Sequence, residues 1–424
     1  MSQAWTWRPL SELFEIGAGK TMSAAARSGA NKVPFLRTSN VLWNRLDLSV
    51  VDEMAIAPHE LPDKLVESGD LLVCEGGEIG RAAIWDGSIA PMAFQNHLHR
   101  LRSKRGDIDP RFYVYFLQSA FTQLGIFDGA GNKTTIPNLS SSRLMALEVP
   151  HPPLKEQQAI AEVLSTLHDA ISLQRETIST SEELKRATTS GLFRRGVKGE
   201  LPQGSEIGPI PETWQVVTLG SLGKIGNGST PKRSNAGYWS GGTFPWLNSA
   251  KVYDRDIKAG EQFVTRTALA ECHLPTVEPG AVLMAITGQG KTLGNVAVLR
   301  TPATISQHLA YIQADPDRID PDFLRGYLET QYEALRQVAS GGGSTKGALT
   351  CAFLKTLPVP LPELTEQRNI VAVLRSLDQK IALHRDKLAL VEELYHALLL
   401  KIMTGAILAD DLVLPPRDTA GSAA

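Results

Sequence analysis

Apolar residues recur in steps of four and three along two long stretches of the chain, beginning near Ile160 and Ile370. This spacing is the 3.5-residue period of a coiled coil, in which the apolar positions form a seam along each helix. A lone helix would leave its seam in water, so we expect the two helices to pack together. The predicted seam consists of Ile160, Leu164, Leu167, Ile171, Ile178, Ile370, Leu374, Leu377, Ile381, Leu388, Val391, Tyr395 and Leu398.

The two predicted helices belong to a longer internal repeat. LKEQQAIAEVL begins at Leu154, and LTEQRNIVAVL begins 210 positions later at Leu364. At a similar offset, DIDPRFYVYFL at Asp107 matches RIDPDFLRGYL at Arg318. The chain is therefore one unit of about 210 residues duplicated in tandem. Two copies indicate an internal pseudo-twofold arrangement, whereas a solenoid needs at least three repeats.

The remainder of each repeat consists of short apolar runs separated by Gly, Pro, Ser and Asn, as in DLLVCEGG and AVLMAIT. Such runs predict short β-strands, and a helix is expected after each IDP sequence. We therefore predict the α+β fold class, with an irregular antiparallel sheet in each repeat.

Composition narrows the class of protein. With 42% hydrophobic and 21% charged residues, the 424-residue chain has the composition of a folded globular protein of two or three domains. It contains no membrane-length apolar run and no signal-peptide pattern, so we expect a cytoplasmic protein. Cys74, Cys272 and Cys351 are far apart and form no CxxC pair, so neither a metal site nor a disulfide is expected. No cofactor is expected either.

The charge of the chain is unevenly distributed. A net charge of −2 argues against nucleic-acid binding unless the cations are clustered. Four blocks contain no Asp or Glu but several Lys or Arg residues: 16–46, 87–106, 213–253 and 279–314. These blocks are candidate anion-binding surfaces.

Three sequence motifs carry a family resemblance. The helix sequences PPLKEQQAIAEVL and PELTEQRNIVAVL, the linker SEIGPIPETWQVVTLG from Ser205, and GNGSTPKRSNAGYWSGGTFPWLN from Gly226 resemble the specificity subunit of type I restriction-modification enzymes. The resemblance extends over about residues 5–408. The first repeat departs from the family pattern, because its opening stretch reads GAGKTMSAAARSGANKVPFLRTSN, without the TPS-like sequence.

The resemblance implies two similar target recognition domains, each reading one half of a split site in double-stranded DNA, and an antiparallel coiled coil of the two helices between them. It also implies that DNA methyltransferase subunits dock on the helices and that motor-endonuclease subunits join them. The expected parts are target recognition domain 1 (1–152), spacer helix 1 (153–196), a linker (197–212), target recognition domain 2 (213–362), spacer helix 2 (363–408) and a tail expected to be disordered (409–424).

Candidate DNA contacts follow from the chemistry of readout, in which Lys and Arg bind phosphates while polar side chains read base edges. The predicted DNA-binding residues are Lys20, Arg37, Asn40, Lys133, Thr230, Lys232, Arg233, Asn248, Lys251 and Lys346. Tyr238, Trp239 and Trp246 are predicted to be packing residues. No catalytic residues are predicted, so methylation and cleavage would come from partner subunits.

The sequence is compatible with two other functions to different degrees. The stretch AITGQGKT, residues 285–292, partly matches a phosphate-binding loop, but the following LGNVAVLR predicts a strand where such a loop needs a helix. Nucleotide binding is therefore not expected. A non-catalytic bivalent scaffold that holds proteins without DNA remains the alternative, and filter binding of duplex DNA with the methylation partner would separate the two functions.

Overall fold

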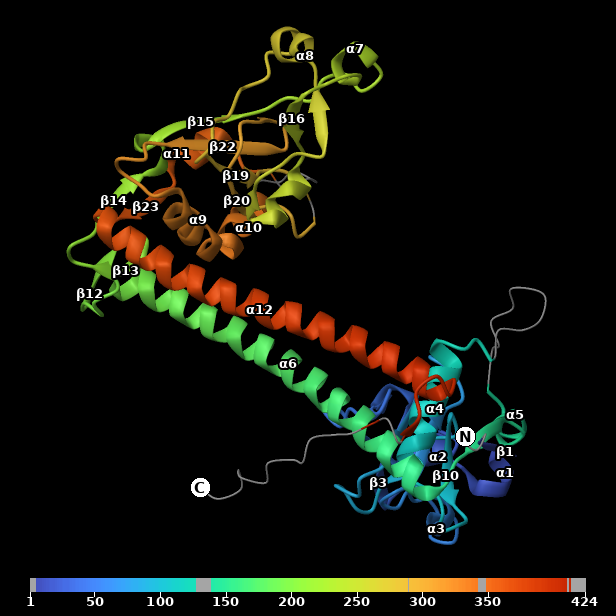
Figure 1. Ribbon diagram of the computed structural model, residues 1–424. Coiled ribbons are helices and arrows are strands. Elements are labelled where there is room, and N and C mark those ends of the chain that lie inside the picture. The colour runs from blue at the N-terminus through green and yellow to red at the C-terminus, as the bar shows by residue number, and fades with distance from the viewer. Residues whose placement is uncertain (1–4, 127–138, 289, 342–347, 410–411, 413–424) are drawn as a thin grey trace. The chain divides into compact units, whose positions relative to one another are not determined.

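A computed structural model of the chain describes residues 5–126, 139–288, 290–341, 348–409 and 412. The chain forms two compact units (Figure 1). Unit 1 comprises Met1–Glu176 and Arg385–Ala424, and unit 2 comprises Thr177–His384. Each long helix therefore contributes one half to each unit. The six-part division expected from the sequence stays a prediction.

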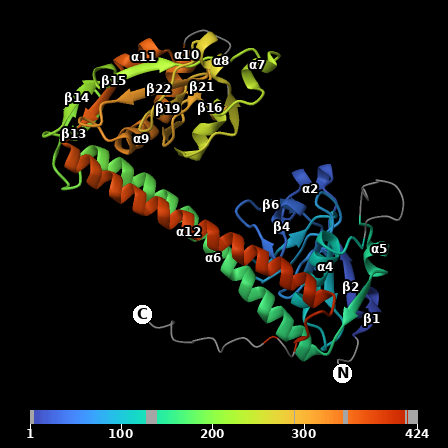
Figure 2. The same ribbon diagram turned by 45° about the horizontal axis from the view of Figure 1, so that its top comes forward.

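Unit 1 is built on an antiparallel sheet of order β2-β10-β7-β8 and a smaller mixed sheet of order β6-β3-β9. Figure 2 marks one strand of each sheet, β2 and β6. Short pairs β1-β11 and β4-β5 complete its strands. The bounds are β1 Thr6–Pro9, β2 Phe14–Ala18, β3 Lys32–Leu36, β4 Val41–Leu42, β5 Arg45–Leu46, β6 Asp52–Ala55, β7 Leu71–Cys74, β8 Ala82–Ile84, β9 Ala93–Phe94, β10 Leu98–Ser103 and β11 Glu148–His151. The short helices are α1 Leu10–Leu13, α2 Ala24–Ser28, η1 Thr38–Asn40, α3 Leu61–Lys64 and α5 Ser141–Met145.

Unit 2 repeats this plan. Its sheet of order β15-β22-β19-β20-β17 and its smaller sheet β18-β16-β21 correspond to the two sheets of unit 1, with β17 added. The strands are β12 Pro202–Ser205, β13 Gly208–Pro211, β14 Gln215–Thr218, β15 Gly223–Asn227, β16 Phe244–Leu247, β17 Asp256–Ile257, β18 Gln262–Val264, β19 Val282–Ala285, β20 Val296–Leu299, β21 Thr304–Ile305, β22 Leu309–Ala314 and β23 Pro358–Leu361. The short helices are η2 Leu219–Ser221, α7 Ala236–Trp239, η3 Ser249–Asp254, α8 Arg266–Glu271, α10 Tyr332–Gly341 and α11 Cys351–Thr356.

One helix packs on the main sheet of each unit, and both start at an IDP sequence, as predicted. Helix α4 (Pro110–Thr122) and helix α9 (Pro321–Thr330) each have Asp as the N-cap and Pro in the first turn. The carboxylate of Asp109 accepts a hydrogen bond from the amide of Arg111, and Asp320 accepts one from Asp322. These caps satisfy backbone donors that the first helical turn leaves unpaired.

The long helices α6 (Leu154–Arg195) and α12 (Leu364–Met403) run antiparallel in each unit. In unit 1, His168 lies against Tyr395 and Arg175 pairs with Glu392, so position rises along α6 as it falls along α12. In unit 2, Lys185 pairs with Asp378 and the amide of Val197 donates to Glu366, in the same sense. The predicted α+β fold with tandem domains and an antiparallel coiled coil is confirmed. Every predicted seam residue is buried or half-buried.

A buried glutamine fixes the start of each long helix. The side chain of Gln157 accepts a hydrogen bond from the amide of Asp109 at 2.8 Å and donates to the carbonyl oxygens of Asp107 and Pro152. Gln367 makes the same three contacts in unit 2, to the amide of Asp320 and to the carbonyl oxygens of Arg318 and Pro362. The sequence match around these glutamines was visible, but their role was not predicted.

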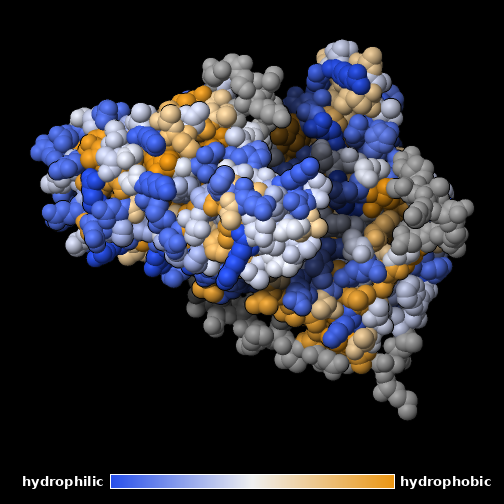
Figure 3. Space-filling model, turned by 90° about the horizontal axis from the view of Figure 1, so that it is seen from above, coloured by the Kyte–Doolittle hydropathy of each residue, from blue (hydrophilic) through white to orange (hydrophobic). Residues whose placement is uncertain are grey.

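A continuous apolar core joins each domain to its helix halves. In unit 1, α4 packs with Ile160 and Leu164 of α6 and with Leu399 and Ile402 of α12. In unit 2, α9 packs with Phe193 of α6 and with residues of α12. Hydrophobic residues also reach the surface, where Figure 3 shows them in patches among hydrophilic ones.

Candidate nucleic-acid interface

An open groove in unit 1 is lined by three cations from the acid-free block 16–46 and by two acids, Asp52 and Glu53. Arg27 of α2, Lys32 of β3 and Arg37 surround it, together with Gln95 beside β9. Arg37 binds Asp52 across the small sheet, with Nη1 and Oδ2 2.8 Å apart. Arg27 and Lys32 have no carboxylate partner among the described residues. The groove therefore offers two unpaired cations that our list of predicted contacts omitted.

The side chain of Asn40 is buried and engaged in local hydrogen bonds, and its role as a DNA contact stays a prediction. The residue is only 4% exposed. Its Oδ1 accepts the amide of Arg37, while its Nδ2 donates to the carbonyl oxygens of Asp47 and Val50. All three contacts are local, so Asn40 shapes the turn that follows η1.

Lys20, another predicted DNA contact in block 16–46, pairs with an acid from outside that block. Lys20 Nζ lies 2.5 Å from a carboxylate oxygen of Glu60. The hydrogen bond from Lys20 lowers the pKa of Glu60, so this carboxylate stays charged beside the lysine. An acid-free sequence block is thus not an acid-free surface. Lys20 would have to leave Glu60 to bind a phosphate.

In unit 2, the loop before α7 carries Lys232 and Arg233, both exposed. The guanidinium of Arg233 lies over two indoles, with Cζ 4.0 Å from the centroid of Trp239 and 4.7 Å from that of Trp246. The two tryptophans pack with Val264, as expected of packing residues. Figure 1 shows α7 and α8 at the end of unit 2 that lies away from its helix halves. The loop is therefore accessible to a large ligand.

A row of polar side chains lies beside this loop, in which Gln307 and His308 are exposed and Thr230 and Thr287 are half-buried. The hydroxyl of Thr230 donates to Gln307, the amide of Gln307 contacts a ring nitrogen of His308, and the other ring nitrogen meets the hydroxyl of Thr287 at 2.5 Å. Side chains of this kind can read base edges. Of these residues, only Thr230 was predicted. The sequence held a signal for Gln307 and His308, because they precede β22 as Asn96 and His97 precede β10 in the first repeat.

The remaining predicted contacts of unit 2 lie at η3. Asn248 is exposed, and its Oδ1 caps η3 by accepting the amide of Ala250, while no hydrogen bond engages its Nδ2 among the described residues. Lys251 binds Asp254 at 2.6 Å and Glu261 at 2.9 Å. These hydrogen bonds raise the pKa of Lys251 and occupy its ammonium group. Asn248 is thus the more available of the two.

Two predicted contacts, Lys133 and Lys346, lie outside the described residues, and their placement stays a prediction.

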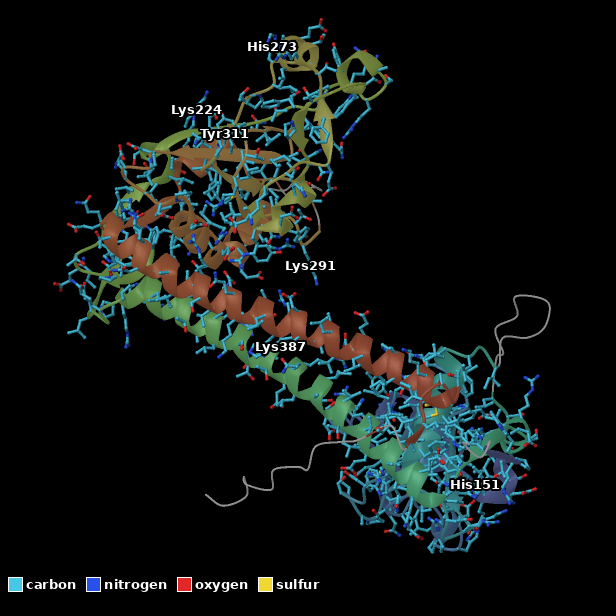
Figure 4. The ribbon with its side chains drawn as sticks, viewed as in Figure 1. His151, Lys224, His273, Lys291, Tyr311 and Lys387 are labelled. Atoms are coloured by element: carbon cyan, nitrogen blue, oxygen red, sulfur yellow. The ribbon has the colours of Figure 1, made fainter. Side chains whose placement is uncertain are left out.

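The phosphate-loop interpretation has no structural support. After Thr292 the chain passes through a turn into strand β20, so the loop does not lead directly into a helix as a phosphate-binding loop does. Lys291 is exposed and projects from its loop (Figure 4). Within the described ranges there is no group of three or more His, Cys, Asp or Glu side chains placed to hold a metal ion. No described helix is long and apolar enough to cross a membrane, and the three cysteines are free.

Comparisons with known proteins match both repeats. The family model for the type I restriction modification DNA specificity domain matches residues 3–183 and 211–393. A Methanocaldococcus jannaschii protein provisionally named the type I restriction enzyme MjaX specificity subunit is 25% identical over 413 residues, covering 95% of this chain and 93% of that protein. The MjaVIII specificity subunit from the same organism is 24% identical over 345 residues, covering 78% and 79%.

The fold has a counterpart among solved structures. The S subunit of a type I restriction-modification system from M. genitalium aligns with a TM-score of 0.58 at 18% identity, covering 94% of this chain and 96% of that one. Sequence motifs, duplicated fold and family model agree. The chain belongs to the family of type I restriction modification DNA specificity domains, of which it carries two copies.

Proposed function

We propose that this chain is the DNA-reading subunit of a type I restriction-modification complex, in which each unit reads one half of a split site. One observation carries the proposal: the two units share a strand order but present different side chains on it. Unit 1 offers a groove with Arg27, Lys32 and Arg37, whereas unit 2 offers the Arg233 loop and the row ending at His308. A common scaffold with different polar surfaces suits recognition of two different sequences.

The long helices have a second role in this proposal, as the docking surface for methyltransferase subunits. Leu383, Leu390 and Leu394 of α12 are 53%, 66% and 48% exposed. Their spacing of seven and four residues places them on one stripe of the helix. Leu184 of α6, 210 positions before Leu394, is also exposed. Apolar stripes of this length on a helix surface suit a protein partner.

The chain itself is proposed to carry no catalysis, with methyl transfer coming from the docked subunits and DNA cleavage from motor-endonuclease subunits. The purified chain should neither hydrolyse ATP nor transfer methyl groups to DNA. Either activity in the chain alone, lost on point substitution within it, would contradict this part of the proposal.

The proposal is tested by sequencing methylated positions in cells that carry the complex. We expect one motif of two different half-sites separated by unread base pairs. An unsplit or palindromic motif would contradict reading by two different units. The scaffold alternative predicts instead that the assembled methyltransferase gains no DNA affinity from this chain, which filter binding with duplex DNA measures.

A further inference from the structure

Two tryptophans fix the loop that leads to Arg233. The indole Nε1 of Trp246 donates a hydrogen bond to the carbonyl oxygen of Ser229 at 3.0 Å. The Nε1 of Trp239 donates to the carbonyl oxygen of Lys232 at 3.3 Å. Trp246 is itself buried. The backbone on the N-terminal side of Arg233 is therefore held by packed residues at two points.

The same two indoles hold the Arg233 side chain. Their rings meet edge to face, with centroids 5.3 Å apart, and the guanidinium lies over both. Attraction between a cation and the ring faces restricts the arginine before any ligand arrives. A side chain that is ordered in advance loses less conformational freedom on binding.

The guanidinium N–H groups of Arg233 remain available. No hydrogen bond or ion pair engages them within the part of the chain that the structure describes, and the residue is exposed. Arg255, Arg300 and Arg325 in the same unit all bind carboxylates. Arg233 instead contacts flat ring faces, which hold the plane of the guanidinium and leave its edge for a ligand.

We propose that Arg233 reads a guanine in the half-site of unit 2; this rests on the proposed function. Guanine presents two acceptors, O6 and N7, in the major groove, and they match the two parallel donors of an arginine fork. Lys232 serves a different purpose. Its ammonium group is a flexible point charge that contacts no ring among the described residues, which suits a phosphate.

The discriminating experiment replaces the guanines of that half-site one at a time by 7-deazaguanine, which lacks N7. Binding is measured for the assembled methyltransferase with the wild-type chain and with Arg233→Met. Methionine keeps an apolar stem against the indoles but donates no hydrogen bond, and unchanged thermal unfolding would show that the loop survives. At one guanine, we expect the wild type to lose about tenfold in affinity and Arg233→Met to lose nothing further.

Lys232→Met is the matched control. It should retain the tenfold effect of 7-deazaguanine but lower the slope of log affinity against log salt by about one. The other half-site should respond to its own analogues equally in all three proteins.

Two results would overturn the role of Arg233 alone: a half-site without guanine, or equal sensitivity of wild type and Arg233→Met at every guanine. In both, the wild-type complex still binds a split site, so the proposed function stands. A wild-type complex that binds no specific sequence would overturn both.

Discussion

Asn44 and Arg255 occupy the same position in the two repeats, 211 residues apart, and both adopt a left-handed backbone with φ of 57°. Each side chain contacts the helix that packs on the main sheet of its unit. Asn44 Nδ2 donates to Gln118 Oε1 on α4 at 2.6 Å, and Arg255 binds Glu329 on α9 at 2.9 Å. Gln118 and Glu329 are also 211 residues apart. The duplication has preserved this contact between domain and helix while changing its chemistry.

Residues of the long helices also take part in each of these contacts. In unit 1 the hydroxyl of Tyr395 donates to Gln118, which makes a neutral joint. In unit 2, Arg255 also binds Asp378 at 2.9 Å, and Asp378 binds Lys185 at 2.6 Å, which makes an ionic joint. Tyr395 and Lys185 lie 210 residues apart and are thus repeat equivalents. Within each unit, the domain is therefore joined to its helix half, and the chemistries of the two joints are not interchangeable.

Tyr395→Lys tests this difference. Tyr395 is 3% exposed, and a lysine there would place an unpaired charge in the neutral joint, at a cost of about 3 kcal/mol or more in unfolding free energy. Tyr395→Phe should cost only about 1–2 kcal/mol, since it removes two neutral hydrogen bonds, one to Gln118 and one from Asn44, and introduces no charge. Adding Gln118→Glu to Tyr395→Lys should restore much of the loss by supplying an acid where unit 2 has Glu329. Urea unfolding measures the stability of all three variants. If Gln118→Glu restored no stability to Tyr395→Lys, the loss would not come from the charge at this joint.

The ionic joint predicts an acid dependence of stability. Burial alone would raise the pKa of Asp378, but hydrogen bonds from Lys185 and Arg255 outweigh it and hold the pKa below its usual range. A depressed pKa in the folded state contributes stability above the unfolded value of about 4, and this stability is lost as pH falls through the folded pKa. The difference in unfolding free energy between wild type and Asp378→Asn should therefore shrink below about pH 4. A difference that stays constant to pH 2 would exclude this linkage.

Gln157→Leu and Gln367→Leu test the buried glutamines. Each substitution removes the partners of one buried amide and two carbonyl oxygens, so each should lower the unfolding free energy by about 1–3 kcal/mol. Glutamate at either site is expected to be at least as costly, because it cannot donate to those carbonyl oxygens. Thermal unfolding gives the readout. A leucine variant as stable as the wild type would show that water or rearrangement replaces the contacts.

Leu390→Glu combined with Leu394→Glu should weaken binding of methyltransferase subunits by at least about tenfold, because two exposed leucines would no longer be buried at the interface. Thermal stability of the chain alone should barely change, since both side chains face solvent. Ala389→Gln, exposed on the same helix but off the leucine stripe, is the control and should bind normally. Copurification and titration with the methyltransferase measure binding of the double variant and of the control. Normal binding by the double variant would show that this part of α12 is not in the docking surface.

The sequence was most informative where periodicity governs structure. A seam of apolar residues can be read without knowing what lies around it, because the helix alone sets its spacing. Contacts of charged loops were less accessible. Arg37 is paired with Asp52, and Lys251 with Glu261. Both acids lie just outside the acid-free blocks in sequence, and strand pairing brings them next to the cations.

Asn40 and Asn248 show the same limit. Asn248 directly follows β16, and Asn40 lies four positions past the end of the matching strand β3. Asn40 is buried and donates to the carbonyl oxygens of Asp47 and Val50, whereas Asn248 is exposed. Whether each side chain is buried or exposed depends on the path of the loop that follows it, and one sequence does not specify that path. The stacking of Arg233 on two tryptophans was likewise missed, because it depends on side-chain directions across separate strands.

We propose that the long helices set the spacing at which the two units read DNA. Inserting four residues between Ile178 and Lys185 lengthens α6 by about 6 Å and keeps the seam roughly in phase as a stutter. A two-residue insertion is the control, since it rotates the apolar face away and should abolish assembly. Sequencing of methylated positions in cells with the four-residue variant should show unchanged half-sites and an unread gap longer by about one or two base pairs, at 3.4 Å each. An active enzyme with the original gap would contradict the claim.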